Sequence, residues 1–168
     1  EFVDTTFIES SHNRVERLGM ARQKLKDLMI KQNLKSSYVC VVDLDDVLNI
    51  NFNSETILNS IKKLEDNKNK YFAISSKSKP YYYDILNFST EELRDLQIID
   101  IQSQRNFSSY YYRKKYIYNN QVKFTKKTDF DAISAFNGMC IYLFKDFLQG
   151  NYFYYNEKKV VPEHLRLN

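Results

Sequence analysis

Three carboxylates, Asp43, Asp45 and Asp46, follow directly on the apolar run Tyr38–Val42. Five apolar or aromatic residues in a row, three of them β-branched, predict a strand buried on both faces, as in a parallel sheet. Carboxylates repel one another, so a cluster at the end of a strand is costly unless a cation neutralises it. Hard oxygen ligands suit Mg²⁺ or Mn²⁺, particularly where phosphates complete the coordination shell. The pattern therefore predicts a divalent-metal site for a phosphate-bearing substrate, and its plainer interpretation is a solvated turn.

The composition is that of a globular protein with a mild positive charge. The 168 residues predict one domain, spanning 1–168, and the 43% hydrophobic and 15% aromatic content argues against disorder. A net charge of +4 permits anionic ligands without indicating a nucleic-acid partner. We expect no membrane span and a cytoplasmic location, because the sequence has neither a long apolar run nor a basic-then-apolar leader. Cys40 and Cys140 lie inside apolar runs, which predicts buried free thiols.

The elements that must position the carboxylates follow from the hydrophobic periodicity. Apolar residues recur at helical spacing over about 13–32, and again from a cap at Asn53 or Ser54 to about residue 64, which predicts two helices. Segment 100–127 shows no steady period. Strands alternating with helices predict an α/β fold with a mainly parallel sheet. The other predicted elements are strands at 2–9, at 71–75 and within 132–142, a short helix ending at Phe88, a helix starting at 90–93 and a helical turn at 145–148.

Several segments, in the same order along the chain, resemble a GT-A glycosyltransferase. The likeness is to capsule-type mannosyltransferase-like enzymes and to glycosyltransferases of large DNA viruses. Val42–Asp45 matches the D-x-D element, and Tyr82–Asp84 resembles the Tyr-Tyr-Asp element. Ser134–Tyr142 is similar to a Ser-Ala-Phe-Gly-Gly-x-x-Ile-Tyr stretch, with Asn137 in place of a Gly. The other matching segments are Phe7–Ser11, Gly19–Gln23 and the pair Glu163-His164.

The resemblance covers about residues 5–168. It implies a GT-A-like, Rossmann-like sheet, mainly parallel and flanked by helices. It also implies transfer of a sugar from a UDP- or GDP-linked nucleotide-sugar to a glycan or glycoprotein acceptor, in the host cytoplasm for a viral enzyme. The first strand of such enzymes, which cradles the nucleotide base, has no counterpart before Glu1. Either the sequence is a fragment of a longer chain that contains this strand, or the alignment with the family differs at this end.

The resemblance also implies a metal site. By similarity Asp45 is the direct ligand of Mn²⁺ or Mg²⁺, and Asp43 contacts the ribose, or the metal through water. His164 supplies a further ligand, with a surface imidazole as the plainer alternative. Arg22 is the expected partner of the diphosphate, because its planar guanidinium binds phosphate oxygens bidentately.

Other residues are implied for the nucleotide and for proton transfer. Glu9 and Ser10 are candidates for contact with the base or the ribose. An inverting enzyme needs a carboxylate base near the acceptor hydroxyl, and the candidates are Glu163 and Asp131, with Asp84 third. Asp84 has a second possible role in orienting the sugar of the donor. A retaining enzyme needs no such base, and the sequence does not decide between the two.

Three alternatives stay open. A haloacid-dehalogenase-type phosphatase would use Asp43 as nucleophile, Asp45 as acid–base and Ser75 as second phosphate ligand, although its first motif normally opens the fold. A non-catalytic carbohydrate-binding module is the second alternative. Single-stranded nucleic acid is the third, for the basic, Tyr-rich segment 105–127, and the scarcity of glycine weighs against it.

Overall fold

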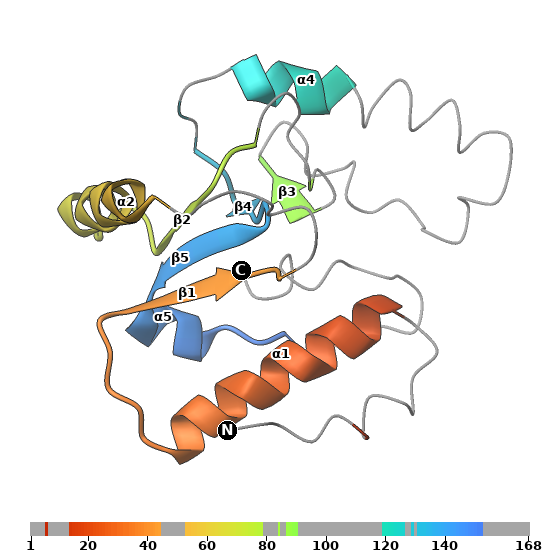
Figure 1. Cartoon of the computed structure of the whole chain (residues 1–168), viewed down its shortest axis with the longest axis vertical. Coiled ribbons are helices and arrows are strands. Elements are labelled where there is room, and N and C mark those ends of the chain that lie inside the picture. Colours follow the sequence, from red (N-terminus) through yellow and green to blue (C-terminus); the bar gives the residue numbers. More distant parts are fainter. Residues whose placement is uncertain are drawn as a thin grey trace, which may run out of the picture.

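The centre of the protein is a three-stranded sheet with the strand order β1-β5-β2 (Figure 1). Its strands are β1 (Tyr38–Val42), β2 (Ala73–Ser75) and β5 (Met139–Leu143). β1 and β2 both pair antiparallel with β5, so they run parallel to each other on its two sides. The computed structural model describes residues 6, 14–44, 53–78, 84, 87–90, 119–126, 129 and 131–152.

Two expectations about this sheet are corrected. The described strands pair antiparallel, so the mainly parallel sheet is not found among them. β1, predicted to be buried on both faces, is an outer strand of the described sheet, and β5 is the strand with a partner on each edge. β1 is only half-buried and exposes Cys40, whereas Cys140 of β5 is buried as expected. The apolar run of β1 resembles that of a central strand, and the sequence does not reveal which strands pair.

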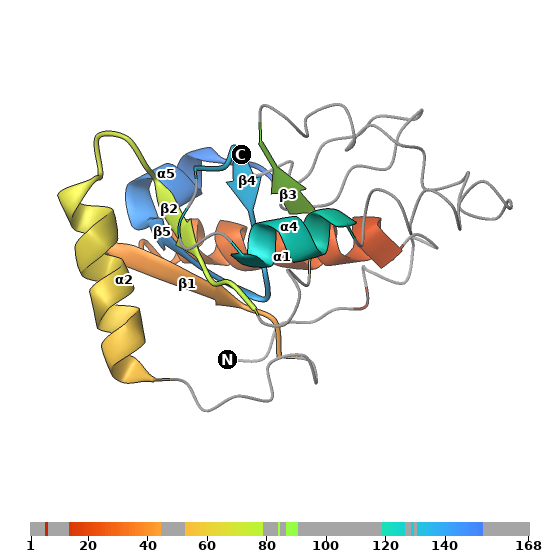
Figure 2. The same ribbon diagram turned by 90° about the horizontal axis from the view of Figure 1, so that it is seen from above.

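The two long helices lie on opposite faces of the sheet (Figures 1 and 2). α1 (Arg14–Lys31) contributes Met29 to one face, and α2 (Ser54–Asp66) contributes Leu64 to the other. Helices on both faces of a sheet confirm the α/β class. Both helices match their predicted ranges closely, because their ends are fixed by local capping.

The caps of these helices are of two different kinds. The Asn53 side chain accepts a hydrogen bond from the Glu55 N–H at 2.9 Å and so caps α2. α1 ends in a Schellman turn, in which the Leu34 N–H donates to the Met29 carbonyl at 3.1 Å. Asn33 occupies the left-handed position of this turn with φ of 50°.

The core forms where β5 presents alternate residues to the two faces of the sheet. Cys140 and Tyr142 are buried on the side of α1, and Ile141 and Leu143 on the side of α2. The run Met139–Leu143 is apolar throughout because both of its faces are covered. The members of the first cluster are Phe136, Cys140, Tyr142, Phe147 and Tyr152.

The remaining elements are short. β3 (Phe88–Ser89) pairs with β4 (Ser134–Ala135). β4 lies within the stretch 132–142 in which a strand was predicted, whereas Phe88, predicted as the end of a short helix, lies in a strand instead. α4 (Asn119–Lys126) lies within the segment that showed no steady period. α5 (Phe144–Gln149) confirms the helical turn after β5. Within the described residues, none of the helices is long and apolar enough to cross a membrane. The strand predicted at 2–9 lies almost wholly outside the described residues.

Candidate active site at the carboxyl ends of β1 and β2

The parallel direction of β1 and β2 brings their carboxyl ends to one edge of the sheet, where β5 begins. Asp43 leaves β1, and its N–H donates to the Gly138 carbonyl at 2.8 Å. Ser76 leaves β2, and its N–H donates to the Met139 carbonyl at 3.0 Å. Polar residues that follow two strands therefore meet the segment 136–138 that leads into β5. Ligands of α/β proteins bind at such edges.

An ion pair from α1 closes one side of this edge. The Arg22 guanidinium lies 2.6 Å from the Asp43 carboxylate, and the two side chains are 14% and 25% exposed. Arg22 also lies over the Phe136 ring, 5.4 Å from its centroid. Burial reduces the screening of the pair by water, and the aromatic face adds a favourable cation–π contact. The structure thus brings together two of the residues that the resemblance singled out.

The buried side chain of Asn137 connects three segments at this edge. Its amide nitrogen donates to the Ser78 hydroxyl at 3.0 Å, and its amide oxygen accepts from the Asp84 N–H at 2.9 Å. Its carbonyl accepts a hydrogen bond from the Ser76 hydroxyl at 2.8 Å. The left-handed backbone conformation falls on Gly138, with φ of 80°, and not on Asn137. Asn137 therefore acts through its side chain, which a glycine at this position would lack.

Asp84 is held in place by its neighbour Asn87. The Asn87 amide nitrogen donates to the Asp84 carboxylate at 2.5 Å. The amide oxygen of Asn87 is buried and finds no hydrogen-bond partner in the part of the chain that the structure describes. A buried acceptor without a partner is uncommon, and a ligand hydroxyl or a water molecule could satisfy it. We call the group of Arg22, Asp43, Ser76, Asp84, Phe136, Asn137 and Gly138 the strand-end site.

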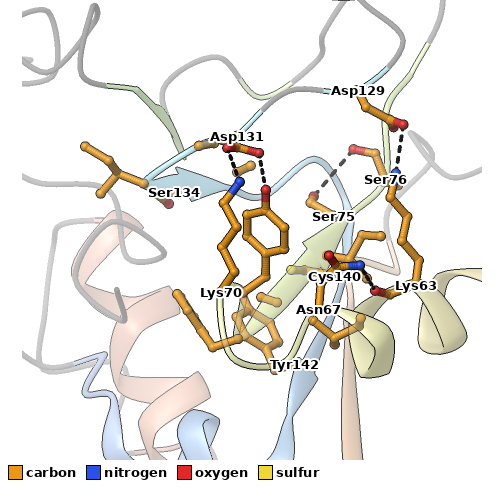
Figure 3. Close-up of a pocket in the computed structure, with 18 of the residues that line it drawn as sticks. Lys63, Asn67, Lys70, Ser75, Ser76, Asp129, Asp131, Ser134, Cys140 and Tyr142 are labelled. Carbon is orange, nitrogen blue, oxygen red and sulfur yellow. Dashed lines mark hydrogen bonds and ion pairs between the residues drawn. The ribbon is translucent and has the colours of Figure 1, made fainter.

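A cavity of about 390 Å³ lies next to the strand-end site, along β2 (Figure 3). Its rim carries two ion pairs, Lys70–Asp131 at 2.9 Å and Lys63–Asp129 at 2.8 Å. Asp131, a predicted base, faces this cavity and also accepts a hydrogen bond from the Tyr71 hydroxyl (Figure 3). The hydrogen bonds from Tyr71 and Lys70 lower the pKa of the Asp131 carboxyl, and a lowered pKa weakens a general base.

One buried thiol lines the same cavity. Burial raises the pKa of the Cys140 thiol to about 12, so it stays protonated near neutral pH. A protonated thiol is a poor nucleophile and a poor metal ligand. Cys140 therefore serves the core, where it packs with Tyr142.

Several predicted site residues lie outside the described part of the chain, so their placement is not tested. Among the residues that are described, no three His, Cys, Asp or Glu gather closely enough to hold a metal ion. Two of the three predicted metal ligands are not among those residues. The predicted residues outside the described ranges are Glu9, Ser10, Asp45, Glu163 and His164.

The roles of Ser76, Ser78 and the Asn137 side chain were not predicted from the sequence. The run Ser75–Ser78 follows a predicted strand with three hydroxyls, which was a local signal for a polar site. For Asn137 the only signal was its departure from the Gly of the resembling stretch. Comparisons of the chain with known protein families, with curated proteins and with solved structures find no match.

Proposed function

We propose that the chain is a metal-dependent, GT-A-like glycosyltransferase that moves a sugar from a nucleotide-diphosphate sugar to an acceptor hydroxyl. The observation that carries the proposal is the convergence of four segments at the strand-end site. Arg22, Asp43, Asp84 and the stretch 136–138 all belong to segments that resemble the enzyme family, and they are distant in sequence. Their convergence is what a shared function would require.

The residue chemistry of this edge fits a divalent ion. Asp43 is a hard oxygen ligand at the end of a strand, and its carboxylate keeps about a quarter of its surface exposed. In the proposal Asp43, Asp45 and His164 hold Mn²⁺ or Mg²⁺. When bound, the ion supplies Lewis-acid stabilisation of the charge that develops on the leaving diphosphate.

The chain's own residues bind and orient the substrates. Arg22 carries a fixed positive charge that can be shared between Asp43 and a phosphate oxygen. Asp84, fixed by Asn87 and Asn137, orients hydroxyls of the transferred sugar. Glu163 is the preferred base for an inverting reaction, because the pKa of Asp131 is lowered.

The phosphatase alternative fits the geometry less well. It requires Asp43 and Ser75 to face one phosphate, but β5 lies between their strands. Two strand spacings correspond to about 9–10 Å. The Ser75 hydroxyl donates instead to the Met139 carbonyl at 3.1 Å. The glycosyltransferase proposal does not require Asp43 and Ser75 to bind the same phosphate.

The test is binding of UDP- and GDP-sugars, measured as thermal stabilisation with and without Mn²⁺. A ligand at 100 times its Kd stabilises the folded state by about 2.7 kcal/mol, which corresponds to about 5–10 °C for a chain of this size. We expect such a shift for one nucleotide-sugar in Mn²⁺, and its loss in Asp45→Ala and Asp43→Asn. Asp66→Asn, an exposed carboxylate of α2, is the control.

The same preparations give a second measurement, the release of UDP or GDP in the presence of Mn²⁺. Release of inorganic phosphate from a phosphomonoester, without any response to nucleotide-sugars, would favour the phosphatase. A wild-type chain that responds to neither class of ligand, or an Asp45→Ala chain with full Mn²⁺-dependent affinity, would contradict the proposal.

A further inference from the structure

The cavity beside β2 lies between two sheets that do not pair with each other. β2 is an outer strand of the described three-stranded sheet, and β4 belongs to the two-stranded one. The cavity is lined by β2 on one side and by Asp129 and residues 131–135 on the other (Figure 3). Its volume of about 390 Å³ lies within the range of ligand sites. It is therefore a slot that has the edge of a strand as one wall.

The hydrogen-bond ladder determines which backbone groups face this slot. The Leu143 N–H donates to the Phe72 carbonyl at 2.8 Å, and the Ser76 N–H donates to the Met139 carbonyl at 3.0 Å. In an antiparallel pair the residues that bond to the partner strand alternate with residues that point away from it. Ala73 and Ser75 therefore direct their N–H and C=O groups outward, away from β5.

These outward groups form a repeating pattern. Within the described residues, the N–H and C=O groups of Ala73 and Ser75 make no hydrogen bond. A donor and an acceptor on every second residue are the groups that another extended chain pairs with, about 6.6–6.8 Å apart along the strand. A glycan lacks the alternating backbone N–H and C=O groups that pair with a strand edge. The pattern favours a peptide over a glycan.

The charged side chains at the slot disfavour a basic occupant. Four of the five charged side chains that line it form two ion pairs, Lys63–Asp129 and Lys70–Asp131, and Lys77 leaves the lining with a formal net charge of +1. The apolar side chain of Ile133 also lines the slot. An occupant without positively charged side chains complements these walls.

We propose that this slot binds an extended polypeptide segment without basic side chains, which adds as a strand to the outer edge of β2. In terms of the proposed function, on which this assignment rests, the segment is the acceptor and carries the hydroxyl to be glycosylated. Ser76 lines the cavity and also donates to the Asn137 carbonyl at 2.8 Å. A peptide that follows β2 toward its carboxyl end therefore arrives at the strand-end site.

The test uses the whole chain and a defined probe, the fluorescently labelled, N-acetylated and C-amidated peptide Ala-Val-Thr-Val-Ala-Gly. Binding is measured by fluorescence anisotropy without nucleotide or Mn²⁺. Ala73→Pro removes one outward N–H and blocks the edge, yet it breaks no bond to β5. We expect it to weaken binding at least about tenfold. Ala73→Ser, which keeps the N–H, is the matched control.

A second arm leaves the protein unchanged, in case the proline variant fails to fold. A peptide N-methylated at every residue keeps its side chains but has no backbone N–H to donate from either edge, and we expect it to lose binding to the wild-type chain. Equal binding of the methylated and unmethylated peptides, or of the proline and serine variants, would overturn the inference. So would an absence of peptide binding in a chain that binds a nucleotide-sugar. Peptide binding without any nucleotide-sugar binding would uphold the strand-docking site and refute the glycosyltransferase.

Discussion

Two kinds of ion pair connect distant parts of this chain, and they differ mainly in how far water reaches them. Arg22–Asp43 joins α1 to the end of β1, with side chains 14% and 25% exposed. Lys70–Asp131 joins the loop after α2 to the far wall of the cavity, with side chains 63% and 66% exposed. Their N–O distances are similar, 2.6 and 2.9 Å. Exposed pairs contribute little because solvent and salt screen them, whereas a half-buried pair is costly to break.

Because the two kinds of ion pair differ in exposure, we expect the strand-end site to be held rigidly and the rim of the cavity to open more easily. At the strand-end site the Phe136 ring lies against Arg22 of the ion pair, and the buried Asn137 side chain holds the neighbouring Ser78 and Asp84. At the rim of the cavity both ion pairs are exposed to solvent. A rigid group suits the binding and orientation of a reacting phosphate and sugar. A weakly held rim suits the entry of a larger ligand.

The largest expected effect is that of breaking the half-buried pair. Arg22→Ala leaves the Asp43 carboxylate partly buried without its guanidinium, and we expect the free energy of unfolding to fall by about 2–3 kcal/mol. Urea denaturation measures it. The control is Arg17→Ala, an exposed arginine on the same helix, which should change the stability by less than about 0.5 kcal/mol. Equal losses in the two variants would mean that the Arg22–Asp43 pair contributes no more to stability than an exposed arginine of the same helix.

The next effect concerns the polar connection beside that pair. Asn137→Ala removes the hydrogen bonds to the Ser78 hydroxyl and the Asp84 N–H, and we expect a loss of about 2 kcal/mol because both form in a buried setting. Asn67→Ala is the matched control at the cavity, where an exposed amide donates to the Lys63 carbonyl. If Asn137→Ala were no more destabilising than Asn67→Ala, the buried hydrogen bonds of the Asn137 side chain would contribute no more to stability than an exposed one.

Local sequence patterns predicted the helices and strands whose ends are determined by neighbouring residues. α1, α2, β1 and β5 lie where periodicity, caps and apolar runs indicated them. These signals depend on neighbours within one or two turns, so a single sequence contains them.

Pairing over long distances was not predictable. The register that sets Cys40 opposite Ile141 spans most of the chain, and the composition of β1 gave no sign that it lies at the outside of the described sheet. For the same reason the antiparallel insertion of β5 between β1 and β2 was missed.

The candidate site likewise has features that local sequence predicts and features that depend on long-range packing. The residue types at Arg22 and Asp43 pointed to phosphate and metal chemistry, but their 2.6 Å contact depends on the packing of α1. Asp131 was selected as a carboxylate of suitable type, and its contacts with Lys70 and Tyr71 come from a segment some 60 residues away. Residue chemistry could be predicted, whereas the partner that changes the pKa of a group could not.

The smallest expected effect is that of pH on the rim. Hydrogen bonds from Tyr71 and Lys70 hold the pKa of the Asp131 carboxyl below its ordinary value of 3.8. A lowered folded-state pKa contributes stability that is present above the ordinary value and is lost as the pH falls through the folded value. The unfolding free energies of the wild type and of Asp131→Asn should therefore differ slightly at pH 5 and converge toward pH 2.

The control for this pH series is Asp66→Asn, which removes a negative charge from an exposed position of α2. Raising the salt concentration at pH 5 should reduce the difference between the wild type and Asp131→Asn, because both partners of Asp131 lie at the surface. The Arg22→Ala effect should respond less to salt, since water reaches that pair less. If both effects faded equally with salt, burial would not distinguish the strand-end site from the rim, and the rim would have no greater freedom to admit a peptide.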